Sequence, residues 1–588
     1  MRIILHREVP DDTHLQAQWN ALIDQMESAE VFYTYEWACA MQRAYASALV
    51  PFLVLGYEGE NLIGVGSLAT DPEQHTGSFL AGTTADYCDF LSHPSQRNQL
   101  VTAAFSELAK AGVRKIALAN VPADSATVAA LHAAAPMSGY RAYMRPAYLC
   151  AQLKLGTGDA RMALKTTHVR KHMFRRSMNR LAKEGPVVLN HARTWREIEP
   201  ILPSFSIAHV ARFLATGRIS NLAKASRRLF LEELAKAMSS SGWVTLTRLM
   251  AGEHAIAWNY GFQFRGSWFW YQPTFDTRQE ALSPGFCLLT EIVSQACDDK
   301  KMQVVDLGLG AEGYKDRFAN STRATLHSTL DASLPRYMTT ITRYRLAGFV
   351  KSFPPLDSMI RRVLSRLAGV RQRLRTSGLR GVVHWAGRRF WQRMSRRDEV
   401  FFYSWPGDAL PGSGPAAFFQ LVPASLEILA MTAIRYEDDT ETHDYLLRAA
   451  SRLRSGKSRG FALLDGDGVP VHLCWVSEFE GFFMDELNTR LTAPAPSADL
   501  IFDCWTPHAV RGRNYYAVTV GRVAQGLARE GRDAWIFSAS TNAASVRGLE
   551  ASGFVRRYSM LRRRVLTFET RTKVASSVSQ PAEAVLRS

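Results

Sequence analysis

Short apolar runs, several of them alternating with polar positions, predict strands at intervals along the first half of the chain. The segment 50–70, VPFLVLGYEGENLIGVGSLAT, contains two such runs around a Glu-Gly turn. RKIALANV, at 114–121, predicts another strand between two helical stretches. Three further runs, at 243–251, 253–264 and 267–273, predict consecutive strands joined by tight turns.

Helical periodicity occupies much of the sequence between these runs. It predicts helices at 195–213, 222–239 and 283–299. A strand at 302–308 follows the last of them, and TRATLHSTL, at 322–330, alternates like a further strand. Strands and helices are therefore interleaved, which is typical of an α/β chain.

The same kinds of pattern recur after residue 398. LEILAMTAI, at 426–434, predicts a strand, and HDYLLRAASRLRSG, at 443–456, predicts a helix. GFALLDG and PVHLCWVS, within 460–477, predict a hairpin around a Gly-Asp-Gly turn. The remaining predicted elements are a strand at 499–505, a helix at 513–529, a strand at 534–540, a helix at 542–552 and a strand from Phe554.

The order of these elements divides the 588 residues into five segments. We predict an α/β fold (α+β mixed sheets) in which the N-terminal half contains two parts that each mix helices and strands. The predicted segments are an N-terminal mixed part (1–160), a second mixed part (161–335), a helical linker (336–397), a C-terminal domain (398–573) and a disordered tail (574–588).

Basic residues are concentrated in the linker. The chain has a net charge of +17, and 336–397 holds 16 of its 71 Lys and Arg residues but one of its 54 Asp and Glu residues. Apolar residues, including Trp385 and Trp391, share the predicted helices with these arginines. Such basic amphipathic helices bind anionic membrane surfaces, or they pack their apolar face on the flanking domains. The sequence leaves both interpretations open.

The rest of the composition is that of a folded, soluble protein, with 47% apolar and 21% charged residues. The chain has no apolar run of ~18 residues, and MRIILHREVPDD lacks a signal-peptide core, so we expect a cytoplasmic protein, free or peripheral at the inner membrane. Its seven scattered cysteines suit reduced thiols. His168 and His172 have metal-ligand spacing but no evident third ligand, so we expect surface or structural histidines and no metal cofactor.

The stretch VVDLGLGAEGYKDRF, at 304–318, has the spacing of a dinucleotide-binding loop. Gly308, Gly310 and Gly313 follow an apolar run in the pattern G-x-G-x-x-G. A dinucleotide fingerprint needs a crossover helix, and about ten to twelve residues are required for one. Eight residues separate Gly313 from the strand that begins at Thr322. The glycines are therefore interpreted as shaping a turn.

Near the C-terminus, ASTNAASVRGLEASGFVRRYSM, at 539–560, resembles the last conserved region of the GNAT acetyltransferase superfamily. The matching residues are Asn542, Ser545, Gly553 and Phe554. Asn542 suits a helix N-cap, and Gly553 suits a helix end. The resemblance implies a GNAT-like C-terminal domain with Asn542 and Ser545 at an acyl-CoA site.

Upstream, residues 503–531 resemble the acyl-CoA loop of that superfamily, in which glycines and a helix N-terminus hold the pyrophosphate. Arg511 matches the loop, and Arg513 is a further candidate for binding the cofactor. Asn514 and Tyr516 replace the glycines. The family's Tyr, the general acid for the thiolate, is replaced by Leu549, which counts against ordinary acetyl-CoA catalysis in this domain.

A second resemblance covers about 165–320. The segment 269–320 looks like the cellulose-biosynthesis acetyltransferase family of CelD/BcsL type, and the basic helix containing Arg170 resembles the family's entry motif. The matches are Trp270, Tyr271, Ser283-Pro284-Gly285, Asp306, Gly310, Tyr314-Lys315 and Phe318. That family is related to the FemAB-type aminoacyl transferases, which implies tandem GNAT-like folds in 1–335.

The resemblance implies acyl transfer without a covalent intermediate. The helix that begins at Ser283, with Gly285 and Phe286, would present N–H groups to a pyrophosphate. Candidate catalytic residues are Asp306, as a base or orienting group, with Tyr314 and Lys315. The ordinary alternatives are a turn cap for Asp306 and a surface ion pair for Lys315. Asp86 and Asp89 line the cleft between the two halves, or they lie in a solvated loop.

Three functions are compatible with these features. The leading hypothesis is an acyl-CoA-dependent N- or O-acyltransferase of GNAT type in cellulose or exopolysaccharide biosynthesis, acting on a glycan or its precursor. Acetyl-CoA or another acyl-CoA would be the co-substrate, and 336–397 would contact the anionic inner membrane or a polysaccharide synthase. The alternatives are a FemAB-like transferase that uses aminoacyl-tRNA, with the basic helix at 161–183 on its phosphates, and a catalytically inactive GNAT-fold scaffold. We expect a nucleic-acid partner only in the alternative that uses aminoacyl-tRNA.

Overall fold

The chain forms two compact units. The computed structural model describes residues 1–73, 75–169, 171–310, 313–351, 395–407, 419–565 and 568–575. Unit 1 consists of Met1–Arg212 and Lys224–Ser352, and unit 2 consists of Phe213–Ala223 and Phe353–Ser588. Most of the predicted basic linker, as well as Arg170, lies outside the described residues.

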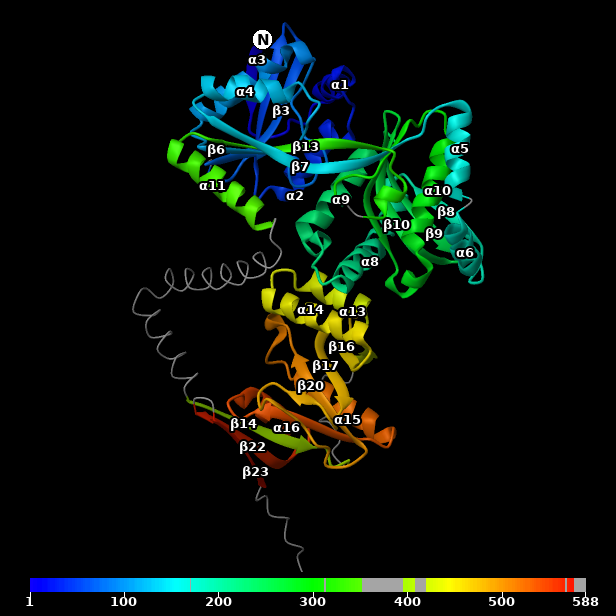
Figure 1. Ribbon diagram of the computed structural model, residues 1–588, viewed down its shortest axis with the longest axis vertical. Helices are drawn as coiled ribbons and strands as arrows, with labels where there is room; N and C mark the ends of the chain where they lie inside the picture. The colour runs from blue at the N-terminus through cyan, green and yellow to red at the C-terminus, as the bar shows by residue number, and fades with distance from the viewer. Residues whose placement is uncertain are drawn as a thin grey trace, which may run out of the picture. The chain divides into compact units, whose positions relative to one another are not determined.

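A single 13-stranded mixed sheet runs through the described part of unit 1 (Figure 1). Its order is β1-β2-β3-β4-β6-β13-β7-β12-β11-β10-β9-β8, and β5 pairs with β3. The strands are β1 (Arg2–His6), β2 (Val50–Glu58), β3 (Asn61–Thr70), β4 (Thr76–Phe79), β5 (Leu91–Ser92), β6 (Lys115–Pro122), β7 (Arg141–Lys154), β8 (Val187–Ala192), β9 (Val244–Ala251), β10 (His254–Phe264), β11 (Ser267–Phe275), β12 (Val304–Asp306) and β13 (Ser321–Asp331).

The two halves of unit 1 exchange their last strands. β13, the last strand of the second half, lies between β6 and β7 of the first half. β7, the last strand of the first half, lies between β13 and β12 of the second half. β13 pairs antiparallel with β7 from Ser321↔Gln152 to Asp331↔Arg141, while β12 pairs with β7 through Val304–Asp306. The exchange joins what would otherwise be two separate sheets into one.

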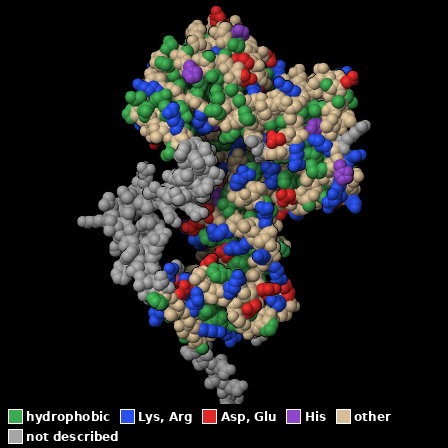
Figure 2. Space-filling model, viewed as in Figure 1, with side chains coloured by type: hydrophobic (Ala, Val, Ile, Leu, Met, Phe, Trp, Pro, Cys, Tyr) green, Lys and Arg blue, Asp and Glu red, His purple; other side chains and the backbone are tan. Residues whose placement is uncertain are grey.

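Helices cover the sheet of unit 1. They are α1 (Thr13–Leu22), α2 (Tyr35–Tyr45), α3 (Pro94–Lys110), α4 (Thr127–Met137), α5 (Gly158–Val169), α6 (His172–Leu181), α7 (Trp195–Ile198), α8 (Leu202–Ala215), α9 (Ala225–Met238), α10 (Pro284–Asp298) and α11 (Leu334–Lys351). The predicted helix at 195–213 is divided into α7 and α8, because Pro200 disfavours helical geometry at the residue before it. Figure 2 shows Lys and Arg side chains gathered where α6 lies in Figure 1.

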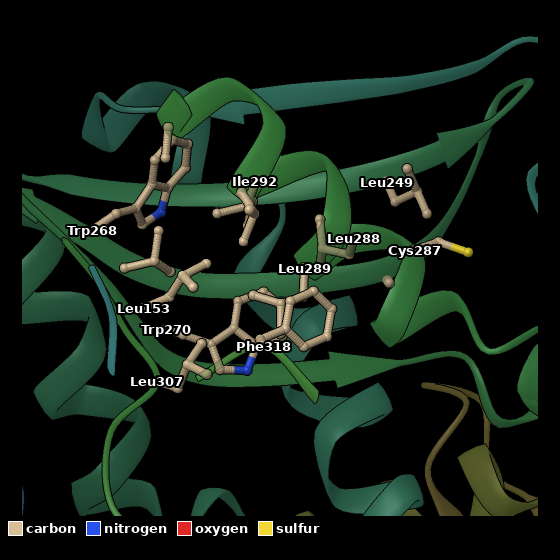
Figure 3. Close-up of a cluster of buried hydrophobic side chains, with 14 of the residues drawn as sticks. Leu153, Leu249, Trp268, Trp270, Cys287, Leu288, Leu289, Ile292, Leu307 and Phe318 are labelled. Atoms are coloured by element: carbon tan, nitrogen blue, oxygen red, sulfur yellow. The ribbon is translucent and has the colours of Figure 1, made fainter. Parts of the chain in front are cut away.

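α10 packs on β9–β12 and closes the core of the second half. Trp268 and Trp270 of β11 lie against Leu288 and Ile292 of α10, and Phe318 completes the cluster (Figure 3). All five side chains are buried. Burying large apolar side chains between sheet and helix is the main stabilisation available to such a layer. The core therefore fixes α10 and the end of β12 relative to one another.

Unit 2 has its own eight-stranded sheet, in the order β15-β16-β17-β20-β21-β14-β22-β23, and a separate β18–β19 hairpin. The strands are β14 (Ser395–Ser404), β15 (Gln420–Pro423), β16 (Arg459–Leu464), β17 (Pro470–Glu478), β18 (Phe483–Met484), β19 (Thr489–Arg490), β20 (Ala498–Trp505), β21 (Asp533–Ala539), β22 (Val555–Val565) and β23 (Phe568–Ala575). The helices are α13 (Leu426–Arg435), α14 (Thr440–Ser455), α15 (Tyr515–Arg529) and α16 (Ala543–Ala551).

Two expectations for unit 2 need correction. The predicted strand at 426–434 is wrong, because this segment forms α13. Ser425 caps that helix by accepting the N–H of Ile428, and Leu429, Ala430 and Ala433 are buried along one face. The predicted disordered tail at 574–588 is wrong for its first two residues, since β23 extends to Ala575, and 576–588 lie outside the described residues. No helix in the described part of the chain is long and apolar enough to span a bilayer.

A buried arginine provides a test of how the first half is held together. The Arg97 side chain is 1% exposed and pairs with Asp89 at 3.2 Å, although burial still raises the pKa of the Asp89 carboxyl. Replacing Arg97 by Met would leave that carboxylate buried without a counter-ion. We expect R97M to lower the free energy of unfolding by about 3–5 kcal/mol in urea titrations. K110M, at an exposed position of the same helix, should change it little, and equal effects of the two would contradict the prediction.

Candidate functional site

Asp306 occupies the point where the exchanged strands meet. It ends β12 and is buried, and its carboxylate accepts hydrogen bonds from both halves of unit 1. Oδ2 accepts from the Tyr87 hydroxyl at 2.9 Å and from the Gln152 amide at 2.8 Å, while Oδ1 accepts from the Gly308 N–H at 2.7 Å. Burial raises the pKa of Asp306 despite these donors. The sequence indicated neither Tyr87 nor Gln152.

Tyr314 and Lys315 lie in the turn that follows β12, the strand that ends at Asp306. A 3-10 turn at Lys315–Arg317 leads directly to β13, so no crossover helix occupies the described residues from Gly313 onward. The buried Lys315 ammonium donates to the Leu309 carbonyl at 2.7 Å, and the Tyr314 hydroxyl accepts from the Trp270 indole N–H at 3.1 Å. The glycine-rich stretch is a turn that presents these side chains, as its length predicted.

Asp86 is a second carboxylate of this site. A Cβ at Gly308 would lie 2.5 Å from its Oδ2, so the missing side chain of Gly308 makes room for Asp86. Burial and then the Asp306 carboxylate raise the pKa of Asp86 to about 7, while Lys315 and Arg227 oppose the shift. Asp89 points elsewhere, into its pair with Arg97. Of the two aspartates singled out in the sequence, only Asp86 joins Asp306.

Arginines surround this carboxylate pair. The buried Arg227 of α9 donates to the Tyr271 hydroxyl at 2.7 Å. Arg323 of β13 pairs with Glu30 at 2.6 Å and lies 4.9 Å over the ring of Tyr87. Burial raises the pKa of Glu30 to about 7 although Arg323 lowers it. Together these residues form a charged cluster, the junction site, at the strand exchange.

The N-terminus of α10 presents fewer free donors than the sequence suggested. Ser283 is the N-cap with a φ of 51°, and its carbonyl accepts the N–H groups of Phe286 and Cys287. Pro284 has no N–H. Among the first-turn residues 284–287, this leaves the N–H of Gly285 as the one without an acceptor among the described residues. The Phe286 ring packs 5.4 Å from that of Phe318, in the core.

Unit 2 contains an open cleft between two strands of its sheet. β20 and β21 pair in parallel from Ala498↔Asp533 to Ile501↔Ile536, and beyond this point both strands continue without pairing with each other. A cleft of about 1280 Å³ opens beyond the last pair. All four residues predicted to bind the cofactor in this unit line the cleft, namely Arg511, Arg513, Asn542 and Ser545.

The first turn of α15 forms one wall of this cleft. Gly512 and the N-cap Asn514 have φ values of 81° and 63°, so Asn514 adopts the left-handed conformation that a glycine usually supplies. The N–H groups of residues 512–517 have no acceptor among the described residues. Helix N-termini with free N–H groups bind phosphates. This wall is a ready anion site.

Of the other two departures from the motif, Tyr516 has a structural counterpart and Leu549 has none. The Tyr516 hydroxyl lies 2.9 Å from Ser545 Oγ, and its ring occupies the space left by Gly548, where a Cβ would approach to 2.6 Å. Asn542 caps α16 by accepting the Ser545 N–H at 3.1 Å. Leu549 is buried in the core of the unit, so it does not reach the cleft.

The junction site predicts a pH-dependent stability. The folded-state pKa of Asp86, about 7, exceeds its ordinary 3.8, so the folded chain binds the extra proton between about pH 4 and 7. The free energy of unfolding should therefore fall as pH rises through this window, by at most about 1.4 kcal/mol per pH unit for this group. D86N should reduce that slope in urea titrations at pH 5 and pH 7.5. The control E253Q, in an exposed turn, should keep it; an unchanged slope in D86N would refute the assignment.

Comparisons with known proteins identify the type of domain present. Residues 168–316 match the family model described as acetyltransferase (GNAT) domain. No curated protein matches the sequence. Among solved structures, FemX is similar over 58% of this chain and 99% of its own, at 9% identity and a TM-score of 0.41.

Two further structures are similar over comparable lengths. The similarity to L-PGS from Bacillus licheniformis covers 57% of this chain and 97% of the L-PGS chain, at 12% identity and a TM-score of 0.37. A tandem GNAT protein from the clavulanic acid biosynthesis pathway covers 56% and 99%, at 12% identity and a TM-score of 0.33. The predicted mixed α/β fold is confirmed by the sheets of the two units, and residues 168–316 are a domain of the GNAT acetyltransferase type.

Proposed function

We propose that the protein is an acyl-CoA-dependent N- or O-acyltransferase whose unit 2 binds the acyl-CoA. The observation that carries this proposal is the cleft between β20 and β21, with the free N–H groups of α15 at its wall. The width of the opening follows from the end of strand pairing at Ile501 and Ile536, which leaves room for an extended ligand. Backbone donors at a helix N-terminus suit a pyrophosphate.

Cationic side chains around the cleft complement a coenzyme that carries several phosphates. Arg513, Arg547 and Lys457 line it, and none of them has an ion-pair partner among the described residues. Arg511 is held in place, because it donates to the Thr506 carbonyl and lies 5.0 Å over the Trp505 ring. Unpaired cations beside free N–H groups favour a polyanionic ligand.

Unit 1 holds a second, separate proposed acyl-transfer site, in which the catalytic groups are Asp306, Tyr314 and Lys315 and the junction site adds Asp86. A carboxyl with a pKa of about 7 can accept a proton from an attacking amine or hydroxyl near neutral pH. The CelD/BcsL-type resemblance of about 165–320 supports a role in cellulose or exopolysaccharide biosynthesis, with a glycan or glycan precursor as acceptor. Under the same proposal, 336–397 contacts the anionic inner membrane or a polysaccharide synthase.

Calorimetry with acetyl-CoA tests the donor site. The full-length chain should bind acetyl-CoA, and R513Q should weaken binding about 10- to 150-fold, because a charge-assisted hydrogen bond to phosphate contributes about 1.5–3 kcal/mol. R529Q removes the same charge at the opposite end of α15, so it should bind like the wild type.

The outcomes separate the rival functions. Equal affinities of R513Q and R529Q would remove unit 2 as the donor site. Absence of acetyl-CoA binding by the wild-type chain would refute the acyl-CoA proposal and favour a GNAT-fold scaffold or the aminoacyl-tRNA alternative.

A second candidate function, aminoacyl transfer from tRNA, is favoured by the exposed face of α6. A surface hollow of about 490 Å³ on this face is lined by His172, Arg175, Arg176, Asn179, Arg180 and Lys183. No acidic side chain lines it, and the four cations have no ion-pair partner among the described residues. Figure 2 shows Lys and Arg side chains gathered on the surface where α6 lies in Figure 1. Such a face suits the phosphates of an RNA.

Salt-dependent RNA binding tests this alternative. If α6 holds phosphates, the chain should bind tRNA in filter or fluorescence titrations, and R175E/R180E should lower the slope of log affinity against log salt by about two. R114E/K300E changes the charge equally at exposed positions of unit 1. Equal losses in both double variants, or no tRNA binding by the wild type, would exclude the alternative.

A further inference from the structure

His472 is a buried histidine at the wall of the unit 2 cleft. It lies on β17 and is 1% exposed, yet it lines the cleft together with Cys504, Thr506 and Tyr516. Its ring lies 5.8 Å from the ring of Tyr516. The sequence motifs of the acyl-CoA site did not include it.

One ring nitrogen of His472 is engaged and the other is not. Nδ1 lies 2.7 Å from Thr506 Oγ1. Nε2 is buried and has no hydrogen-bond partner among the described residues. A buried polar atom without a partner is costly, so a ligand in the cleft is the natural source of one. Burial lowers the pKa of His472 to about 3, which keeps the imidazole neutral near pH 7.

The backbone beside His472 is irregular at the same level of the cleft. β17 and β20 pair at Leu473↔Trp505 and again at Trp475↔Phe502, so two residues of β20, Asp503 and Cys504, oppose one residue of β17. Asp503 has a φ of 45°. A bulge of this kind interrupts the ladder and redirects the strand. His472 and the bulge therefore lie at the same part of the cleft wall, next to the point where β20 leaves β21.

We infer that His472 is a catalytic residue of unit 2 whose neutral imidazole donates its Nε2 proton to the carbonyl oxygen of the bound acyl thioester. The inference rests on the proposed function, since it requires acyl-CoA in this cleft. Thr506 acts as a positioning residue. Its hydroxyl donates to Nδ1, and this places the ring proton on Nε2.

The step balances without a further reactant. The acceptor nitrogen or oxygen attacks the carbonyl carbon and forms the new C–N or C–O bond. The carbonyl π electrons move to the oxygen, where the Nε2 proton stabilises the developing charge. Collapse of the tetrahedral intermediate breaks the C–S bond, and the thiolate leaves. The proton lost by the acceptor is released to solvent, from which the thiolate is protonated.

A role as general base fits the same residue less well. Efficient general bases have pKa values near the working pH. A buried imidazole that stays neutral to about pH 3 accepts protons weakly, whereas its N–H remains available as a donor over the whole neutral range. The unpartnered Nε2 of His472 is thus better suited to donating a hydrogen bond than to transferring a proton.

Isotope-edited infrared difference spectroscopy tests the inference on the full-length chain with acetyl-CoA labelled with ¹³C at the carbonyl. In the wild type, the carbonyl stretch of bound acetyl-CoA should lie below that of free acetyl-CoA. H472A should lose most of this lowering, H472Q should keep part of it through its amide N–H, and T506V should fall between them. The same series should show a drop in kcat for thiol release of about 10²–10³-fold in H472A with little change in KM.

The controls distinguish a failure of the His472 role from a failure of the proposed acyl-CoA binding by unit 2. Calorimetry should show acetyl-CoA affinities within about threefold for the wild type and the three variants, since one neutral hydrogen bond is a small part of the binding. If the wild type binds acetyl-CoA but H472A and H472Q show the same carbonyl stretch as the wild type, the role of His472 is overturned and the proposed function stands. No binding by the wild type would overturn the proposed function, and this inference with it. Thermal unfolding of each variant shows whether a change reflects misfolding, and H472Q decides the outcome where H472A is unfolded.

Discussion

The exchange of β7 and β13 is the constraint on which unit 1 depends. Both neighbours of each of these strands come from the other half, so neither half completes its sheet alone. The long antiparallel register between them, from Ser321↔Gln152 to Asp331↔Arg141, satisfies backbone groups that would otherwise be buried without partners. The junction site exists because of this exchange, since Gln152 reaches Asp306 only when β7 lies beside β12.

The charge arrangement of the junction site follows from that burial. Two carboxylates close together in a buried site cannot both ionise easily. Asp306 accepts three hydrogen bonds, which stabilise its charged form. The pKa of Asp86 is raised to about 7 by burial and by the charge of Asp306. Asp86 therefore takes up a proton as the pH falls through about 7, while burial also raises the pKa of Asp306. Lys315 and Arg227 supply the opposing positive charge.

Local sequence signals predicted elements better than they predicted the site. The two strands around the Glu-Gly turn became β2 and β3, and the Ser-Pro-Gly start of α10 was correct to within a residue. The segment 426–434 was misassigned because an apolar run of that length fits a buried strand or a helix, and the capping by Ser425 decides between them. Tyr87 and Gln152 were missed because they meet Asp306 from 219 and 154 residues away, a distance over which local patterns contain no information.

The departures from the acyl-CoA motif in unit 2 show how a site can survive changes that look damaging in the sequence. Asn514 takes the left-handed backbone that the motif assigns to glycine, so the loop keeps its path. The Tyr516 ring fits because residue 548, on the facing helix, is a glycine: a Cβ there would clash with the ring. The large residue at 516 is thus compensated by the small one at 548. Leu549 alone has no counterpart, since it is buried in the core. Under the proposed function, a site that keeps its shape and loses one proton donor would still bind acyl-CoA, and the thiolate would be protonated from solvent in the open cleft.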